Sequence, residues 1–362
     1  MSAKAVREYD GKLLLAHWLH RVAVPSTSTE PTTGSKFIQP TTRLAHISID
    51  TSLLQDKAQF EQHVRSTLDQ LEVTHPWLLT NKLVAKPDQL IKRRGKSGLL
   101  LLNADWADAR AWIEKHAAKD VLVDSVAGVL KTFLVEPFIP HPSNTEYYIC
   151  INSDRDGDNI LFTHEGGIEV QDAFPTAESI RSALLVHVPE AKHDVLVDFI
   201  SRLYAVYIDL HFTYLEINPL VVLDPTEDEP ARVYYLDLAA KLDQTAEFEA
   251  GPKWAIARAP QNIGIAGVAP SSAVGADAGP GMDFPAPFGR ELTKEEAYVQ
   301  ELDSKTGASV VYSDAIAALG QAHELANYGE YSGAPTETQT YEYAKTILDL
   351  MTRSAVPHPE GK

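Results

Sequence analysis

The chain has 362 residues, of which 44% are hydrophobic and 23% are charged, as is typical of a soluble globular protein with room for two domains. Its formal net charge of −18 argues against nucleic acid or an anionic membrane as the main partner, because binding to polyphosphate depends on clustered Lys and Arg. The single cysteine, Cys150, excludes a disulfide framework and a cysteine-based metal site, and it favours a reducing compartment such as the cytoplasm.

The N-terminal part of the chain predicts helices and short strands around one loop. Residues 1–20 carry early acidic side chains and an apolar run interrupted by histidines, which predicts an amphipathic helix and not a signal peptide. No stretch approaches the roughly 18 consecutive apolar residues that a membrane span needs. Residues 25–43 are rich in Ser, Thr and Pro, so we expect a mobile loop there. The following patterns predict a helix, two strands and a second helix: residues 53–71, 83–86, 99–103 and 104–119.

The middle of the chain alternates between strand patterns and helical patterns. Three β-type runs cover residues 130–138, 146–153 and 159–164. The Asp-Arg-Asp-Gly-Asp segment between the last two predicts a hairpin tip, since it lacks the ligand spacing and the closing Glu of a calcium loop. Helical patterns follow at 177–188 and 189–210. We therefore expect an α+β (α/β) fold in which helices pack on mostly antiparallel strands.

A predicted hairpin from Thr213 to Asp243 organises the chain. Two apolar runs flank the polar turn 224–232, and each run carries one polar residue that a strand built only for packing would not favour, Asn218 and Asp237. Paired strands can bring these two side chains together as oxygen ligands for Mg²⁺, which takes one or two protein ligands. An alternative is a hydrogen-bonded Asn-Asp pair that fixes the hairpin register.

Two further segments carry residues suited to a nucleotide. The basic cluster at 86–96 places Lys86 at a strand end and Arg94-Gly95 in a loop, where an ammonium, a guanidinium and backbone N–H groups could hold phosphates. Its alternative is a solvated charged loop. The strand end at Pro137 and the nearby Glu146 could face an adenine edge and a ribose hydroxyl. The alternative is a strand that simply ends at a proline, followed by a solvated Glu. A P-loop is excluded, because the chain lacks its Gly-x-x-x-x-Gly-Lys-Ser/Thr motif.

The C-terminal part begins with a change in composition. Residues 254–287 contain a low-complexity Gly/Ala/Pro stretch, 259–287, that cannot bury much apolar area, and we expect a disordered linker. Helical patterns follow it at 293–302, 313–325 and 336–352.

Six motifs together closely resemble the N-terminal part of the ATP-citrate lyase (ATP-citrate synthase) family. They are Lys-Pro-Asp-Gln-Leu-Ile-Lys-Arg-Arg-Gly-Lys (86–96), Glu-Pro-Phe-Ile-Pro-His (136–141), His-Glu-Gly-Gly (164–167), Phe-Thr-Tyr-Leu-Glu-Ile-Asn-Pro-Leu-Val-Val (212–222), Leu-Asp-Leu-Ala-Ala-Lys (236–241) and Glu-Leu-Ala-Asn-Tyr-Gly-Glu-Tyr-Ser-Gly-Ala-Pro (324–335). The resemblance spans almost the whole chain in order, and a more distant one runs to the β subunit of succinyl-CoA synthetase.

The resemblance implies an ATP-grasp domain at residues 1–253, a linker at 254–287 and part of a Rossmann-like citrate-binding domain at 288–362. It also implies a set of binding residues. For ATP these are Lys86, Arg94, Gly95, Pro137, Ile139, Glu146 and Asp237, and for Mg²⁺ they are Asp303, Thr306 and Ala308, with Asn218 as a neighbour.

The family makes acetyl-CoA and oxaloacetate from citrate, CoA and ATP for lipid synthesis in the cytoplasm, through a phosphorylated histidine. None of the 13 histidines here lies in the family's Gly-His-Ala-Gly context, and His164 reads as structural. The resemblance therefore implies a hetero-oligomer in which a partner polypeptide supplies the phosphohistidine and the CoA site.

The sequence also departs from the family pattern. Gln171-Asp172-Ala173 replaces a loop near the phosphates, residues 25–43 and 254–283 look like insertions, and a strand pair and a glycine-rich loop are missing within 303–312. The chain also ends before the residues that hold citrate in the family, so we do not expect it to turn over alone. Two alternatives remain, a non-catalytic or aberrant member acting as an assembly or regulatory partner, and a succinyl-CoA-synthetase-like ligase.

Overall fold

The computed structural model describes residues 3–22, 24, 43–91, 94–123, 126–154, 156–163, 166–170, 174–226, 231–258, 282–289, 319–320 and 337–353. The chain divides into two compact units, residues 1–289 and 290–362. In the second unit the helix α9 (Glu337–Arg353) confirms the helical pattern predicted at 336–352. The other two helices predicted in this unit fall outside the described residues, apart from 319–320, and so does the loop expected at 25–43, apart from Arg43.

The first unit is built on a seven-stranded sheet, here called the large sheet, with strand order β1-β13-β11-β8-β9-β10 and with β12 paired to β11. Its strands are β1 (Ala3–Val6), β8 (Glu146–Ser153), β9 (Asp158–Phe162), β10 (Gly166–Val170), β11 (Phe212–Leu223), β12 (Arg232–Tyr235) and β13 (Leu238–Asp243). Every pairing among them is antiparallel, as the sequence predicted.

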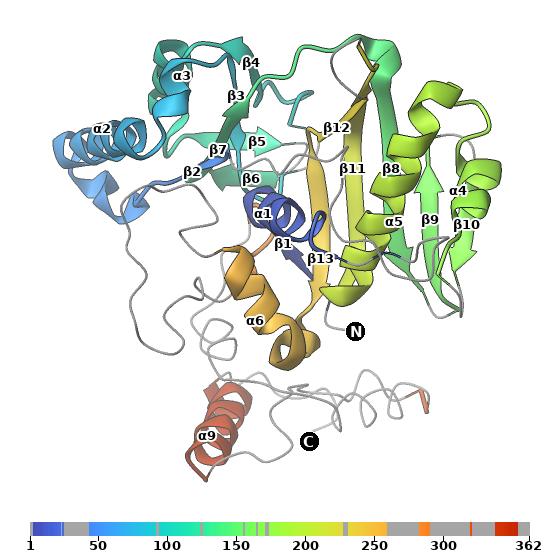
Figure 1. The fold of residues 1–362 in the computed structure, drawn as a ribbon. Coiled ribbons are helices and arrows are strands. Elements are labelled where there is room, and N and C mark those ends of the chain that lie inside the picture. The colour runs from blue at the N-terminus through green and yellow to red at the C-terminus, as the bar shows by residue number, and fades with distance from the viewer. Residues whose placement is uncertain are drawn as a thin grey trace, which may run out of the picture. The chain divides into compact units, whose positions relative to one another are not determined.

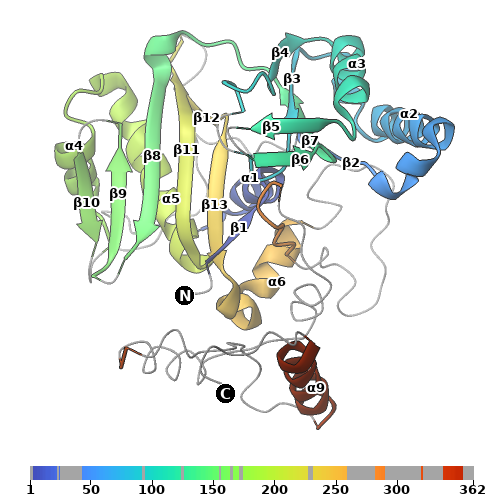
Figure 2. The same ribbon diagram turned by 180° about the vertical axis from the view of Figure 1, so that it is seen from behind.

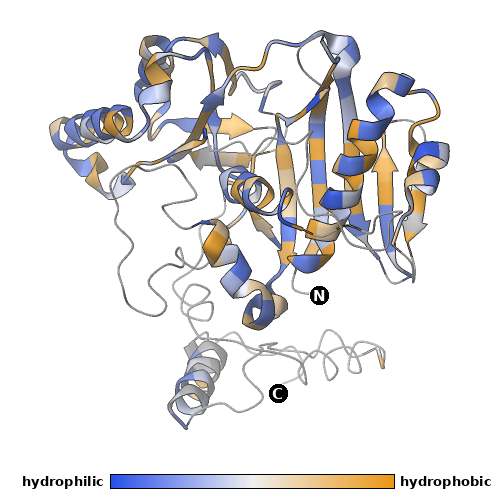
Figure 3. Cartoon of the chain, in the orientation of Figure 1, coloured by the Kyte–Doolittle hydropathy of each residue, from blue (hydrophilic) through white to orange (hydrophobic). Residues whose placement is uncertain are grey.

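Helices cover one face of the large sheet (Figure 1), and Figure 2 shows the opposite face. They are α1 (Glu8–Trp18), α4 (Ala177–Leu184) and α5 (His193–Asp209). Leu215 and Ile217 of β11 point into the core beneath these helices, whereas Tyr214 and Glu216 alternate with them and line a cavity. The hydrophilic residues of α4 and α5 lie on the side away from the sheet (Figure 3).

A four-stranded sheet, here called the small sheet, has the order β2-β7-β3-β4 and its own hydrophobic core. Its elements are β2 (Ala45–Ser48), α2 (Lys57–Thr74), β3 (Leu83–Pro87), β4 (Leu101–Ala104), α3 (Trp106–His116) and β7 (Thr132–Pro137), with a separate hairpin of β5 (Asp120–Val123) and β6 (Val126–Val129). Trp106, Ala109, Ile113 and His116 form the buried face of α3. Short 3₁₀ helices complete the unit: Thr51–Gln55, Pro76–Leu79, Ser143–Thr145, Glu190–Lys192 and Gln244–Ala246.

Both ends of the expected linker pack against these cores, which corrects its boundaries. The helix α6 (Glu247–Ala257) buries Trp254 completely, and the Trp254 indole donates a hydrogen bond to the carbonyl of Leu210 at 3.0 Å. After the gap, Met282 and Phe284 pack against the core of the large sheet and Phe288 packs against that of the small sheet. The low-complexity composition did not predict that aromatic side chains in these two segments would contact apolar residues of the cores. Residues 259–281 lie outside the described part.

Most predicted elements are confirmed, but several short strands were missed. Residues 3–6 form a strand, not the start of the predicted N-terminal helix, because they pair with β13 in a register that aligns Ala3 with Asp243. The strands β2, β5, β6 and β10 also had no clear sequence signal. None of the helices in the described part of the chain is long and apolar enough to cross a membrane.

Candidate functional site

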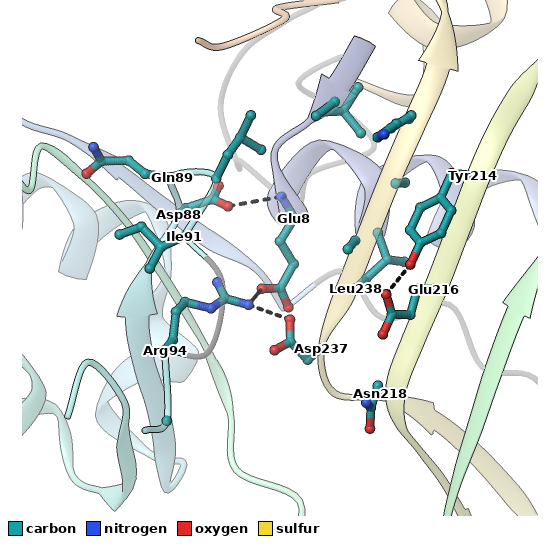
Figure 4. A pocket seen from close by; sticks show the side chains of 17 residues that line it. Glu8, Asp88, Gln89, Ile91, Arg94, Tyr214, Glu216, Asn218, Asp237 and Leu238 are labelled. Carbon is teal, nitrogen blue, oxygen red and sulfur yellow. Dashed lines mark hydrogen bonds and ion pairs between the residues drawn. The ribbon is translucent and has the colours of Figure 1, made fainter. Parts of the chain in front are cut away.

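A cavity of about 740 Å³ lies between the segment after β3 and the large sheet. Four of the sequence-predicted site residues line it: Arg94, Gly95, Asn218 and Asp237. Figure 4 shows Arg94 pointing across the cavity toward Asp237, while Asn218 lies farther along β11 from Tyr214 and Glu216. Residues distant in the sequence thus meet at one concave surface.

The predicted hairpin brings Asn218 and Asp237 together. The backbone N–H of Asn218 donates to the carbonyl of Asp237 at 3.1 Å, and the N–H of Leu236 donates to the carbonyl of Pro219 at 3.1 Å. The second strand is interrupted between Tyr235 and Leu238, so residues 236 and 237 lie in a break between β12 and β13. The Asp237 carboxylate accepts a hydrogen bond from Arg94, and not from the Asn218 amide that the alternative interpretation required.

The Arg94 guanidinium is buried and bound on several sides, so it is not part of a solvated loop. Its Nη2 donates to Glu8 at 2.5 Å and also to Asp237, and its Nη1 donates to the carbonyl of Pro87 at 2.9 Å. Burial opposes the charge, but the neighbouring carboxylates of Glu8 and Asp237 raise the pKa of Arg94. A permanent cation therefore lies at the cavity wall.

Lys86 lies behind that wall and does not line the cavity. Its ammonium donates to Glu8 at 2.6 Å, to the carbonyl of Leu236 at 2.9 Å and to Glu136 at 2.8 Å. These three protein acceptors match the three donors of an ammonium group. The predicted contact between Lys86 and a phosphate stays a prediction, and it would require one of these bonds to be exchanged.

Glu8 and Lys12, both on α1, are members of this charged cluster that sequence reasoning missed. The Lys12 ammonium donates to Glu136 at 2.7 Å and to the carbonyl of Leu236 at 2.9 Å, and it lies 2.8 Å from Glu8. Burial alone would raise the pKa of Glu8, but the three cations Lys12, Lys86 and Arg94 hold it well below its usual range. Their only sequence signal was a Glu-Lys spacing of four residues, which is typical of exposed helix pairs.

Asp88 is a second buried carboxyl that lines the cavity and was not predicted. Its Oδ1 accepts hydrogen bonds from the N–H groups of Glu8 at 3.0 Å and Tyr9 at 3.5 Å, in the first turn of α1. Its Oδ2 has no hydrogen-bond partner and lies 3.6 Å from Nε2 of His46. Burial and then the negative charges of Glu8 and Asp10 raise the pKa of Asp88 to about 7.

The remaining predicted ATP residues lie in the connection between the two sheets. Pro137 ends β7, Ile139 follows it, and Glu146 begins β8. Nε2 of His141 lies 3.1 Å from the Glu146 carboxylate, and the His141 Nδ1 is bonded to the carbonyl of Ile139 at 2.7 Å. These residues do not line the cavity, so their role with adenine and ribose stays a prediction.

The oxygen atoms near the hairpin are of the types that a magnesium ion prefers. Asn218 and Asp237 offer an amide oxygen and a carboxylate at the same cavity wall, and Mg²⁺ usually takes one or two carboxylates while water and phosphate complete its octahedron. Within the described ranges no group of three or more His, Cys, Asp or Glu residues forms a preassembled metal cluster. The other predicted magnesium residues, Asp303, Thr306 and Ala308, lie outside those ranges.

Two sheets with a charged cluster and a cavity between them have the architecture of an ATP-grasp module. Comparison with known proteins agrees with this assignment of the fold. Residues 2–254 match the family model of the ATP-citrate synthase ATP-grasp domain, and residues 306–362 match that of the ATP citrate lyase citrate-binding region. The chain belongs to the ATP-citrate synthase family.

Relatives and solved structures support this membership. The chain is 54% identical to "Probable ATP-citrate synthase subunit 2" of Schizosaccharomyces pombe, covering 100% of this chain and 81% of the relative. It is 42% identical to ATP-citrate synthase of Homo sapiens but spans only 30% of that protein's length. The structure of ATP citrate lyase from Methanothrix soehngenii in complex with citrate and coenzyme A matches with a TM-score of 0.62 and 34% identity, covering 100% of this chain and 79% of that one.

Proposed function

We propose that the cavity binds Mg-ATP between the Arg94-Gly95 segment and the hairpin of β11 and β13. The observation that carries this proposal is the meeting of Arg94, Asn218 and Asp237 at one cavity wall. The cavity volume of about 740 Å³ lies within the usual range of small-molecule sites, roughly 300–1,000 Å³. A guanidinium suits phosphate oxygens, and backbone N–H groups near Gly95 are accessible because glycine permits close approach.

The predicted binding residues have separate tasks in this proposal, some of them in the cavity wall and some outside it. Arg94 orients the phosphate chain, with Lys86 joining it when one carboxylate bond is exchanged, while Pro137, Ile139 and Glu146 hold the nucleoside. Asn218 and Asp237 hold Mg²⁺, whose charge offsets that of the phosphates. The terminal phosphoryl group then passes to a histidine of a partner polypeptide, as its bond to the ADP oxygen breaks and a bond to the imidazole nitrogen forms.

The partner also carries the CoA site in this proposal, and the hetero-oligomer makes acetyl-CoA and oxaloacetate from citrate for lipid synthesis in the cytoplasm. Two observations support it. A relative that this chain covers to 81% is named as a subunit. The histidines of this chain also lack the family's phosphorylation context.

Isothermal titration of the full chain with Mg-ADP tests the nucleotide site. We expect binding that Asp237→Ala weakens at least about tenfold, because a hydrogen bond to a charged group, such as that between Asp237 and Arg94, is typically worth about 1.5–3 kcal/mol. Asp120→Ala, which changes an exposed aspartate at the start of β5, is the matched control and should bind as the wild type does. Equal affinity in the wild type and Asp237→Ala would remove Asp237 from the site, and no binding to the wild type would refute the proposal.

A further inference from the structure

Glu8 is the centre of the buried charged cluster behind the cavity. Its Oε1 lies 2.6 Å from the Lys86 ammonium and 2.8 Å from the Lys12 ammonium, and its Oε2 lies 2.5 Å from Nη2 of Arg94. The side chain of Glu8 is only 3% exposed, yet the residue contributes to the cavity wall. One carboxylate thus fixes both cations that the proposed phosphate site uses.

A second carboxylate closes the cluster from the side of the small sheet. Glu136, at the end of β7, lies 2.7 Å from Lys12 through Oε2 and 2.8 Å from Lys86 through Oε1. The three cations and the three carboxylates of Glu8, Glu136 and Asp237 therefore balance in charge. Because Lys12 and Lys86 each bond both Glu8 and Glu136, neither ammonium can turn without breaking a short ion pair.

The close approach of α1 to β13 makes this arrangement possible. A Cβ atom added at Gly11 would lie 2.5 Å from Cδ2 of Leu238, so only glycine fits at this contact without a shift of the leucine. The neighbouring Lys12 consequently reaches the carbonyl of Leu236, in the break between β12 and β13. The first helix is thereby anchored to the hairpin that carries Asp237.

We propose that Glu8 is a positioning residue of the nucleotide site, which holds the Arg94 guanidinium in the orientation that phosphate binding needs and keeps the Lys86 ammonium next to it on the same carboxylate. This inference rests on the proposed function. Glu8 contacts these two cations and acts through them, while Lys12 and Glu136 hold Glu8 and Lys86 in place.

The positioning role makes a prediction opposite to that of simple electrostatics. A negative charge at the cavity wall repels a polyphosphate, so if Glu8 contributed only its charge, Glu8→Gln would tighten the binding of Mg-ADP. A glutamine has one neutral acceptor oxygen in place of two charged ones, so it cannot hold Lys86 and Arg94 together. If orientation dominates, the same variant therefore weakens binding.

Titration calorimetry with Mg-ADP and urea unfolding of the full chain distinguish these outcomes. We expect Glu8→Gln to bind at least about tenfold more weakly than the wild type. The matched control is Asp10→Asn on the same helix, where an equally buried carboxylate pairs with Arg258 at 2.8 Å and does not line the cavity. This control should lose stability but keep wild-type affinity.

A charge-balanced variant separates positioning from general stability. In Glu8→Gln/Lys12→Met the loss of one cation compensates the loss of one anion, so we expect stability to recover at least in part while Mg-ADP binding stays weak. Wild-type or tighter binding by either Glu8 variant overturns the positioning role, and if the single variant does not fold, the double variant decides. Absence of binding to the wild type would refute the proposed function, and the positioning role with it.

Discussion

The buried carboxyl of Asp88 should make the stability of the first unit depend on pH. Asp88 is 1% exposed, and only one of its two oxygens accepts hydrogen bonds, from the first turn of α1. Burial and the charges of Glu8 and Asp10 raise the pKa of Asp88 from an ordinary 3.8 to about 7. The folded chain therefore keeps a proton at this carboxyl near pH 6, whereas the unfolded chain has already released it.

The sign and the size of the effect follow from this difference. Between about pH 4 and pH 7 the folded state binds more protons than the unfolded state at Asp88, so its contribution to stability falls as the pH rises. The interval from 3.8 to about 7 corresponds to about 4 kcal/mol, at roughly 1.4 kcal/mol per pH unit. In Asp88→Asn the amide oxygen can still accept the hydrogen bond from Glu8, but nothing at this position ionises.

We expect the free energy of unfolding of Asp88→Asn, relative to the wild type, to increase by up to about 4 kcal/mol between pH 4 and pH 8. Urea unfolding followed by circular dichroism at several pH values measures it, and the comparison cancels the pH dependence of all other groups. Asp105→Asn is the matched control, because Asp105 caps α3 through a 3.0 Å bond but is exposed. A difference between Asp88→Asn and the wild type that does not change with pH would refute the reasoning.

Two other predictions concern the hydrophobic core and the activity of the chain without a partner. Trp254→Ala should lower the free energy of unfolding by about 3–5 kcal/mol, since it removes a fully buried indole. Phe248→Ala, on the exposed side of the same helix, is the control and should change the free energy of unfolding little. Equal effects of the two variants in urea unfolding would contradict the packing of α6. The purified chain alone should make no oxaloacetate from citrate, CoA and Mg-ATP, because none of its histidines lies in the family's phosphorylation context. A malate-dehydrogenase-coupled assay measures this, and any turnover would contradict the need for a partner.

From the sequence, the candidate site residues of the hairpin could be recognised as polar residues within apolar strand patterns. Asn218 and Asp237 were visible because each interrupts an apolar strand, and the hairpin that joins them has a strong local pattern. Glu8 and Lys12 could not be recognised, because their spacing is that of an ordinary exposed helical pair. Their burial depends on Glu136 and Leu236, which are more than 120 residues away along the chain.

The same physical reason explains the errors in the fold. Long strands with a largely apolar sequence, such as β8 and β11, were predicted nearly to the residue, whereas β1 has only four residues and exists because β13 offers an edge. The boundaries of the expected linker were misplaced because composition reports how much apolar area a segment has on average. It does not show that single residues such as Trp254 and Phe288 have a place in a core.

The backbone carbonyl of Leu236 is a part of this site that a scan of side-chain substitutions would not detect. It accepts hydrogen bonds from both Lys12 and Lys86, each at 2.9 Å, and every amino acid would supply the same oxygen. Substitutions of the half-buried side chain at 236 should therefore leave this acceptor in place, because the oxygen belongs to the peptide group. Inserting or deleting one residue between Tyr235 and Leu238 would turn the oxygen away from the lysines. The position of this oxygen thus depends on the length of the hairpin segment and not on the side chain of residue 236.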